Sequence, residues 1–501
     1  MKYLFYLSST RHPHTTALAD EICRLARDSG NEIAVAYCRT GRGICPMNRR
    51  ADSARCFGCG IGLRKIVSAL PKSVRVFPLL ESFDASRRGR RFEYACAADL
   101  KKLRYKGIEI GYGLLSFFIT VSRDANPEIT PTLREYFDSV LDYEATLIDE
   151  FEALAARERP DVVGIFGGRA FDVKPVFDFA IRERVPIRAY EVVPTPKGAV
   201  IEFFENALPQ DVSANGRRVL ETWDADPRPE AEKRALGTSF FEKRRNGISA
   251  GDVVYTGAQK RGALPPDWNP AKRNVVIFNS SEDEFAALGT EFNSYSLFPS
   301  QLDGIRFIAG TLAEDRDCEI WLRVHPNLKD VRFDFHVKLY ELPREFPNLH
   351  VIPAASEIST YALLDAANRV VVFGSTMGVE SAFWGKPTIL LAGCHYYDLG
   401  VCLTPKTEAE LAELLRAPKL EASGNVENAI KYGHYVMDRA RLGREAEFFF
   451  MGAPKFGRRF FNGVYKDDFA FRLKLWAIEK FSGLIFWRRR AKAPYKAIHR
   501  S

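Results

Sequence analysis

The sequence lacks any apolar run long enough to cross a membrane as a helix. No stretch of about 18 uninterrupted apolar residues occurs among its 501 residues, which excludes a conventional transmembrane helix. It also lacks internal repeats and low-complexity tracts. The opening segment MKYLFYLSST predicts a strand followed by a hydroxyl-rich loop, and its apolar part is much too short for a signal peptide. We therefore expect a cytoplasmic protein.

Length and composition indicate a globular protein with two domains. A chain of 501 residues is too long for one core and suits two domains of about 200 residues each, with an extension. Apolar residues make up 46% of the chain and charged residues 27%, as in ordinary globular proteins. Gly, Pro and charge concentrate in residues 256–273, which we interpret as a linker. The predicted domains are residues 1–255 and 274–454, followed by an extension at 455–501.

Three apolar runs in the second predicted domain are typical of buried parallel strands. They cover residues 274–278, 320–324 and 370–373. The residues that follow them are small, hydroxyl-bearing or histidine: Asn279, Ser280 and Ser281, then His325, then Gly374, Ser375 and Thr376. Ligand crevices of open α/β sheets lie at the carboxyl ends of strands. The pattern therefore predicts an α/β domain with a nucleotide crevice at this edge.

The third strand begins a segment typical of a phosphate and ribose site. Gly374, Ser375 and Thr376 are predicted to open a helix, whose free N–H groups and positive dipole end attract a phosphate. One turn further along, Glu380 can accept hydrogen bonds from a sugar diol. A Gly-Lys-Pro sequence then ends the helix, and a buried strand follows at residues 388–391. The alternative is an ordinary βαβ unit, because most strand–turn–helix units bind nothing.

Together these motifs resemble the donor-binding half of GT-B glycosyltransferases, particularly the bacterial enzymes of capsule and lipopolysaccharide synthesis. The resemblance covers residues 274–391 and implies two Rossmann-like domains and a reaction that needs no metal. In family members that use CMP-activated acidic sugars, a His-Pro motif and a Ser-Ser/Thr motif hold the donor phosphate. By this resemblance His325, Ser375 and Thr376 are phosphate ligands and Glu380 is the ribose ligand. The expected nucleotide-binding set is completed by Ser280, Ser281 and Gly374.

The first predicted domain offers a candidate for binding the acceptor. Residues 162–166 predict a strand that ends in a Gly-Gly-Arg turn, with a helix at 173–184 and a strand at 187–193 after it. This resembles a segment of surface-carbohydrate glycosyltransferases, although that pattern has an asparagine where this chain has Gly168. Arg169 can hold an anionic acceptor or a pyrophosphate. The alternative is an arginine that faces solvent on a loop.

Several residues are candidates for the base that deprotonates an acceptor hydroxyl. Glu191 has apolar neighbours in the sequence, so burial would raise its pKa and suit it to general-base catalysis. The alternatives are His12, which we also place in the acceptor site, and the acidic pair Glu282 and Asp283. The groups expected to neutralise the leaving phosphate are His325, the N–H groups at Ser375 and Thr376, and Arg323 or Lys386.

Nine cysteines do not predict a disulfide framework in a cytoplasmic chain. Five are scattered and are interpreted as small core residues. Cys56 and Cys59 have the spacing of a metal knuckle, and Cys45 is close enough in sequence to join them. Zinc needs about four ligands, and the candidates for the fourth are Cys38, His12 and His14. The sequence thus predicts a structural zinc site or an iron–sulfur cluster, with reduced thiols in a Gly-rich loop as the alternative.

The positive charge of the chain is concentrated at its C-terminus. Residues 455–501 contain 13 Lys or Arg and 3 Asp or Glu, a balance of +10, whereas the whole chain carries +8. Eleven aromatic residues are interleaved with these cations, which favours contact with an anionic membrane surface. The alternative is a C-terminal helix that packs on the first domain, as GT-B proteins commonly have. Nucleic acid is not an expected partner, because no recognised binding fold accompanies the segment.

We therefore predict a two-domain α/β glycosyltransferase at the inner face of the cell membrane. Its donor would be a nucleotide-sugar, with a CMP-linked acidic sugar favoured, and its acceptor a surface polysaccharide or a lipid-linked glycan. One alternative keeps the fold and is a nucleotide-sugar epimerase or hydrolase. The other is a non-catalytic scaffold of a polysaccharide assembly complex.

Overall fold

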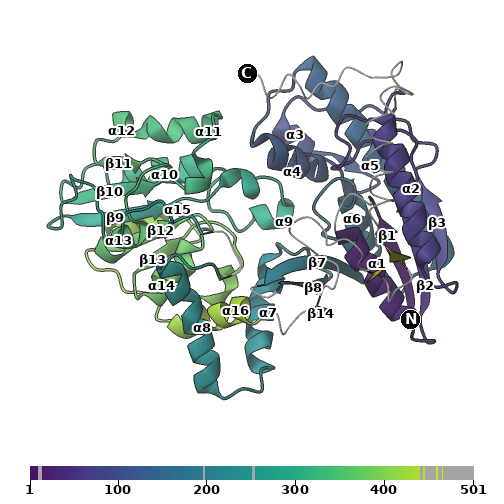
Figure 1. Ribbon diagram of the computed structural model, residues 1–501. Coiled ribbons are helices and arrows are strands. Elements are labelled where there is room, and N and C mark those ends of the chain that lie inside the picture. Colours follow the sequence, from purple (N-terminus) through teal and green to yellow (C-terminus); the bar gives the residue numbers. More distant parts are fainter. Residues whose placement is uncertain are drawn as a thin grey trace. The chain divides into compact units, whose positions relative to one another are not determined.

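A computed structural model describes residues 1–9, 14–87, 89–195, 198–250 and 254–439, and short strands at 444–445, 459–460 and 465–466 (Figure 1). The chain divides into two units. Unit 1 comprises Met1–Pro209 and Gly443–Ser501, and unit 2 comprises Gln210–Leu442. This division differs from the predicted boundary at residue 255, because residues 210–255 belong to unit 2.

Unit 1 contains a seven-stranded sheet in the order β14-β8-β7-β6-β1-β2-β3. Its parallel part, β3-β2-β1-β6-β7, has the strand order of a doubly wound sheet, and β8 and β14 are antiparallel additions at one edge. β1 is buried over almost its whole length, as expected where both faces of a parallel sheet are covered. The strands are β1 (Lys2–Leu7), β2 (Glu32–Cys38), β3 (Arg75–Leu79), β6 (Val162–Phe166), β7 (Ile187–Thr195), β8 (Gly198–Glu205) and β14 (Arg444–Glu445).

The helices of unit 1 pack on this sheet through apolar side chains. Ile22, Val35 and Leu63 belong to one buried cluster that joins the first two helices to the first two strands. The helices are α1 (His14–Leu25), α2 (Ser53–Ala69), α3 (Ala97–Lys102), α4 (Gly111–Ser122), α5 (Pro131–Glu158) and α6 (Lys174–Glu183). Two hairpins complete the unit: β4 (Arg104–Tyr105) with β5 (Ile108–Glu109), and β15 (Arg459–Phe460) with β16 (Tyr465–Lys466).

Unit 2 contains a five-stranded parallel sheet in the order β11-β10-β9-β12-β13. Alternate side chains enter different cores, with Val276 and Phe278 in one cluster and Val275 and Ile277 in the other. Both faces are therefore buried, which explains the continuous apolar runs. The strands are β9 (Arg273–Phe278), β10 (Cys318–Arg323), β11 (Leu349–Ile352), β12 (Arg369–Val372) and β13 (Thr388–Leu390).

The α-helices of unit 2 are α7 (Val212–Asp224), α8 (Glu230–Arg245), α9 (Thr290–Asn293), α10 (Gln301–Thr311), α11 (Asp334–Val337), α12 (Leu342–Glu345), α13 (Thr360–Ala366), α14 (Met377–Phe383), α15 (Glu408–Arg416) and α16 (Val426–Met437). Single 3₁₀ turns are η1 (Glu282–Glu284), η2 (Pro326–Leu328), η3 (Lys338–Tyr340) and η4 (Tyr397–Leu399).

The packing of α8 explains why the boundary differs from the prediction. α8 crosses α16 so closely that a Cβ added at Gly433 would lie 2.3 Å from the carbonyl oxygen of Gly237. On α8, Phe241 also stacks on Phe383 of α14, with ring centroids 4.0 Å apart. Such contacts between distant segments have no local signature in the sequence.

The strands predicted at 162–166, 187–193, 274–278, 320–324, 370–373 and 388–391, and the helix at 173–184, are confirmed to within about two residues. The helix α2 begins after the N-cap Asp52, so Cys56 and Cys59 lie on a helix. None of the helices in the described ranges has the length and apolar character that a membrane crossing requires. Apart from β15 and β16, the basic extension at 455–501 lies outside the described residues.

Candidate functional site

A cavity of about 300 Å³ lies in unit 2 where β9, β10 and β12 end. The order of the sheet reverses between β9 and β12, and such switch points are where doubly wound sheets bind ligands. The polar side chains that line the cavity include Arg244, Asn279, Ser280, Ser281, Glu284, Arg323, His325, Ser375 and Thr376, and its aromatic lining includes Tyr255, Phe285 and Tyr361. Three groups of residues predicted at separate strand ends are thus brought to one cavity.

Ser280 ties the ends of two strands together. Its hydroxyl donates to the carbonyl oxygen of Phe373 at 2.8 Å and accepts from the side-chain amide of Gln301 at 2.8 Å. The Ser280 N–H in turn donates to the Gln301 amide oxygen at 3.1 Å. The side chain of Ser280 therefore shapes the cavity wall, and its hydroxyl proton is already used within the protein.

Ser281 belongs to a network at the same strand end. Its hydroxyl donates to Asp283 Oδ1 at 3.0 Å and accepts from Asn327 Nδ2 at 3.2 Å. The amide of Asn327 also donates to Glu284 Oε1 at 2.8 Å. Ser281 lines the cavity, whereas Asp283 does not. Asp283 is buried and holds the Ser281 hydroxyl in place.

His325 is held in one tautomer at the end of β10. Its backbone N–H donates to Asn279 Oδ1 at 2.8 Å. Its Nδ1 accepts the N–H of Asn327 at 3.2 Å, so the ring proton is assigned to Nε2. The ring packs edge-on against Tyr255, with centroids 5.0 Å apart. His325 can therefore present an N–H donor to an anionic ligand.

The turn from Gly374 to Thr376 connects β12 to α14. Gly374 has φ of +78°, and a Cβ there would lie 2.9 Å from the carbonyl oxygen of Gly393, so this position needs glycine. Ser375 Oγ accepts the N–H of Met377 at 3.3 Å, and the Ser375 carbonyl accepts the hydroxyl of Tyr396. The turn is rigid, and it lines the cavity.

Glu380 lies behind this turn with its carboxylate fully buried. Oε1 accepts from Arg244 Nε at 2.9 Å, and Oε2 accepts from the hydroxyl of Tyr361 at 2.5 Å. Burial, together with the Glu380 carboxylate, raises the pKa of Tyr361, which keeps that hydroxyl protonated as a donor. Arg244 Nη2 also donates to the hydroxyl of Thr376 at 3.2 Å. Both Arg244 and Tyr361 line the cavity, whereas Glu380 positions them.

Sequence reasoning missed Arg244 and Tyr361. Arg244 lies in the last turn of α8, within the segment assigned to the other domain, and Tyr361 lies in the first turn of α13. No motif marks either residue. The sequence points to such partners only through Glu380, because a carboxylate that becomes buried requires a cationic or hydrogen-bonding partner.

Arg323 is a buried cation at the cavity. Its side chain lines the cavity although the residue is only 2% exposed. Its guanidinium donates to the carbonyl oxygens of Pro353 and Ser356, and within the part of the chain that the structure describes no carboxylate forms an ion pair with it. Burial lowers its pKa to about 10, so it remains charged at neutral pH. The other predicted cation, Lys386, donates to the carbonyl oxygens of Asp365 and Ala367 and does not line the cavity.

The acceptor-side candidates lie in unit 1. Glu191 on β7 is opposite Glu202 on β8, and burial raises the pKa of Glu191 to about 7, with the Glu202 carboxylate adding to the rise. Arg169 donates to the hydroxyls of Ser116 and Thr120 on α4, the latter at 3.2 Å. His12 lies outside the described residues. Glu191 and Arg169 belong to unit 1, whereas the cavity belongs to unit 2, and their roles stay predictions.

The four clustered cysteines come together in unit 1. Cys38, Cys45, Cys56 and Cys59 line one small cavity of about 20 Å³. Burial raises the pKa of the first three thiols. No described cysteine forms a disulfide.

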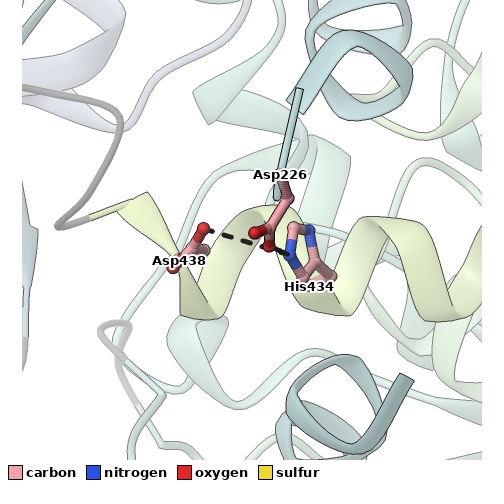
Figure 2. Close-up of side chains that lie close together, drawn as sticks. All are labelled: Asp226, His434 and Asp438. Atoms are coloured by element: carbon pink, nitrogen blue, oxygen red, sulfur yellow. Dashed lines mark hydrogen bonds and ion pairs between the residues drawn. The ribbon is translucent and has the colours of Figure 1, made fainter. Parts of the chain in front are cut away.

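A second group with metal-ligand geometry lies in unit 2, away from the cavity. Asp226, His434 and Asp438 place one ligand atom each within 4.8 Å of one another (Figure 2). His434 Nε2 lies 2.7 Å from Asp226 Oδ2. Arg228 already supplies a cation, because its guanidinium pairs with Asp226 and lies 2.7 Å from Asp438 Oδ2. We interpret this group as an ion-pair network that joins the residues after α7 to the end of α16.

Comparisons with known proteins give only distant likenesses. No protein-family model matches this sequence, and no curated protein matches it. Among solved structures, the Thermosulfurimonas dismutans KpsC beta Kdo 2,4 transferase is 16% identical over 53% of this chain and 78% of that chain, with a TM-score of 0.31. The UDP-GlcNAc 2-epimerase from Neisseria meningitidis is 10% identical over 88% and 98% of the two chains, with a TM-score of 0.24. TM-scores this low carry no argument about function.

Proposed function

We propose that the protein is a glycosyltransferase of GT-B architecture whose nucleotide-sugar donor binds in the unit 2 cavity. The observation that carries the proposal is Arg323, a buried guanidinium that lines the cavity without a described carboxylate partner. Burying a charge is costly unless an opposite charge compensates it. A phosphate group of a nucleotide is such a charge, and it forms strong hydrogen bonds with arginine.

The other donors around the cavity support a phosphate ligand. The N–H at Nε2 of His325, the guanidinium of Arg244 and the hydroxyls of Ser375 and Thr376 all belong to its lining. In glycosyl transfer, negative charge develops on the nucleotide phosphate as the bond to the sugar breaks. Donors held in place before the reaction stabilise that charge without reorganising. Arg244 is held in this way by Glu380.

The aromatic lining supports a nucleoside. Tyr255, Phe285 and Tyr361 offer apolar surface next to the phosphate-binding side chains. A sugar diol would reach Glu380 only indirectly, because its two carboxylate oxygens accept from Arg244 and Tyr361. We propose that Glu380 acts on the donor mainly by holding these two side chains.

The finer features of the function are part of the same proposal. The donor is a cytidine nucleotide with an acidic sugar, and the acceptor is a surface polysaccharide or a lipid-linked glycan. Glu191 is the preferred base, because a carboxyl with a pKa of about 7 can take up a proton near neutral pH. His12 and the acidic pair Glu282 and Asp283 are the alternatives. The basic extension at 455–501 carries the positive excess of the chain and is proposed to contact an anionic membrane surface.

Thermal-shift and calorimetric titration with CMP, UDP and GDP test the proposal. A nucleotide at about 100 times its dissociation constant stabilises the protein by roughly 2.7 kcal/mol. Stabilisation by CMP is expected, whereas stabilisation by UDP or GDP alone would reject the cytidine assignment but keep a nucleotide-sugar donor. Binding of none of the three would favour a non-catalytic scaffold. If the protein binds a nucleotide-sugar and steadily epimerises or hydrolyses it without an acceptor, an epimerase or hydrolase replaces the transferase.

A further inference from the structure

Four cysteines of unit 1 converge from three separate segments of the chain. Cys38 is the last residue of β2, Cys45 lies in the following loop, and Cys56 and Cys59 lie in the first turns of α2. Residues three apart on a helix share a face, so Cys56 and Cys59 are presented together. All four line one cavity, although 20 residues lie between the first and the last. The remaining cysteines do not line it.

Hydrogen bonds within the loop before α2 hold Cys45 beside the helix. Asn48, which is 3% exposed, accepts the N–H of Asp52 at 3.0 Å and donates to the carbonyl oxygen of Gly43 at 3.0 Å. Its N–H donates to the carbonyl oxygen of Cys45 at 2.8 Å, which closes a tight turn. The carboxylate of Asp52 caps α2 by accepting the N–H of Ala54 at 2.8 Å.

Two N–H groups point at the sulfur of Cys56, and its S–H donates to the carbonyl oxygen of Gly43 at 3.6 Å. The sulfur accepts the backbone N–H of Gly43 at 3.1 Å and the side-chain amide of Asn48 at 3.1 Å. N–H donors that point at sulfur stabilise its anionic form and are a regular feature of metal–thiolate centres. The hydroxyl of Ser9 also lies 3.5 Å from the sulfur of Cys59.

The local charge suits four thiolates. Residues 39–55 contain five arginines and one aspartate, and one of these arginines, Arg55, lines the cavity. A divalent ion with four thiolates carries a net charge of about −2. An excess of positive charge on the enclosing loop offsets it.

We propose that Cys38, Cys45, Cys56 and Cys59 bind one zinc ion that fixes the loop after β2 to the start of α2. The cavity of about 20 Å³ has room for about one water-sized particle, which fits a single ion. These cysteines do not form a group whose ligand atoms lie within 4.8 Å of one another in the described structure, so the proposal requires their side chains to rotate toward the ion. The residues of this site belong to unit 1, whereas those of the proposed nucleotide cavity belong to unit 2.

Metal analysis of the full-length protein, purified under reducing conditions without added metal, tests the proposal. We expect about one zinc per chain, because a structural tetrathiolate site binds one ion. The Cys56→Ser, Cys59→Ser double variant should lose that zinc, whereas Cys96→Ser, which changes an exposed cysteine outside the cavity, should keep it. Absence of zinc from the wild-type protein, or its retention by the double variant, would overturn the proposal. Iron with inorganic sulfide in place of zinc would overturn the assignment of the ion.

A second measurement avoids dependence on the folding of the double variant. Cobalt added to chelator-treated wild-type protein should give the visible absorption of tetrahedral cobalt bound by thiolates. The conservative variant Cys59→His should still bind one ion but shift these bands, because imidazole replaces one sulfur. A cobalt spectrum without thiolate character in the wild-type protein would reject the site.

Discussion

Replacing Arg323 with methionine tests whether this cation binds a ligand or stabilises the fold. Burial lowers the pKa of the guanidinium to about 10, which corresponds to a penalty of about 3 kcal/mol on the charged form in the folded protein. At neutral pH, below that pKa, the folded state carries this penalty. Arg323→Met removes it, and the loss of the hydrogen bonds to Pro353 and Ser356 costs about 1 kcal/mol each. We therefore expect a melting temperature that is unchanged or slightly raised.

The effect of Arg323→Met on nucleotide binding should be large. A hydrogen bond between charged groups contributes about 1.5–3 kcal/mol, which is about a 10- to 150-fold loss of affinity. Isothermal titration calorimetry with the nucleotide that the wild-type protein binds measures this loss. Differential scanning fluorimetry of the same samples without ligand measures the melting temperature.

Arg369 provides a matched control in the same sheet. It is equally buried, at 1% exposed, but it lies at the start of β12 and donates to the carbonyl oxygens of Leu414, Leu415 and Ala417 at the end of α15. Burial also lowers the pKa of Arg369, so Arg369→Met removes a penalty of the same kind but leaves three carbonyls without a donor, against two for Arg323→Met. It should therefore have a lower melting temperature than Arg323→Met and leave nucleotide affinity unchanged. Wild-type affinity in Arg323→Met would refute the reasoning, and so would a pattern in which both variants only lose stability.

Four further predictions concern the donor site, a titrating carboxyl and the C-terminus. His325→Ala and Ser375→Ala should each lower turnover by about 10²- to 10³-fold with the fold intact by circular dichroism, since each removes a group beside the leaving phosphate; near wild-type turnover in either would discard that group. Glu380→Gln should weaken donor binding more than it slows turnover, and a turnover defect at unchanged affinity would contradict its positioning role. Because burial raises the pKa of Glu191 from 4.5 to about 7, its own contribution to the free energy of unfolding is largest below pH 4.5 and is lost as the pH rises to about 7. Glu191→Gln should remove this fall in denaturant titrations, and an identical pH profile in both proteins would show that Glu191 is not buried as described. Deleting residues 458–501 should reduce binding to anionic liposomes at low salt, and equal binding by the truncated protein would reject the membrane role.

The sequence alone predicted many of the strands, although not β2, β3, β8 or β11, and the edge at which the cavity lies. Runs such as Val370–Val372 are buried on both faces, so every position is apolar and the strand is recognisable without its neighbours. Parallel strands bring their carboxyl ends to one edge. The residues after three strands, among them Ser280, His325 and Ser375, were therefore expected to meet, and they line one cavity.

Only the tertiary structure decided which side chains complete that cavity. Arg244 and Tyr361 reach Glu380 from helices that are distant in the sequence, and no local pattern encodes a pairing between α8, α13 and α14. The boundary between the units also depended on close helix packing at Gly237, which composition cannot reveal. In the same way, spacing identified Cys56 and Cys59 but left Cys38, His12 and His14 as candidates for the fourth ligand, and the position where β2 ends is what brings Cys38 to the cavity. The periodicity of apolar residues indicates which positions are buried locally, whereas long-range packing determines which residues pair with a buried charge.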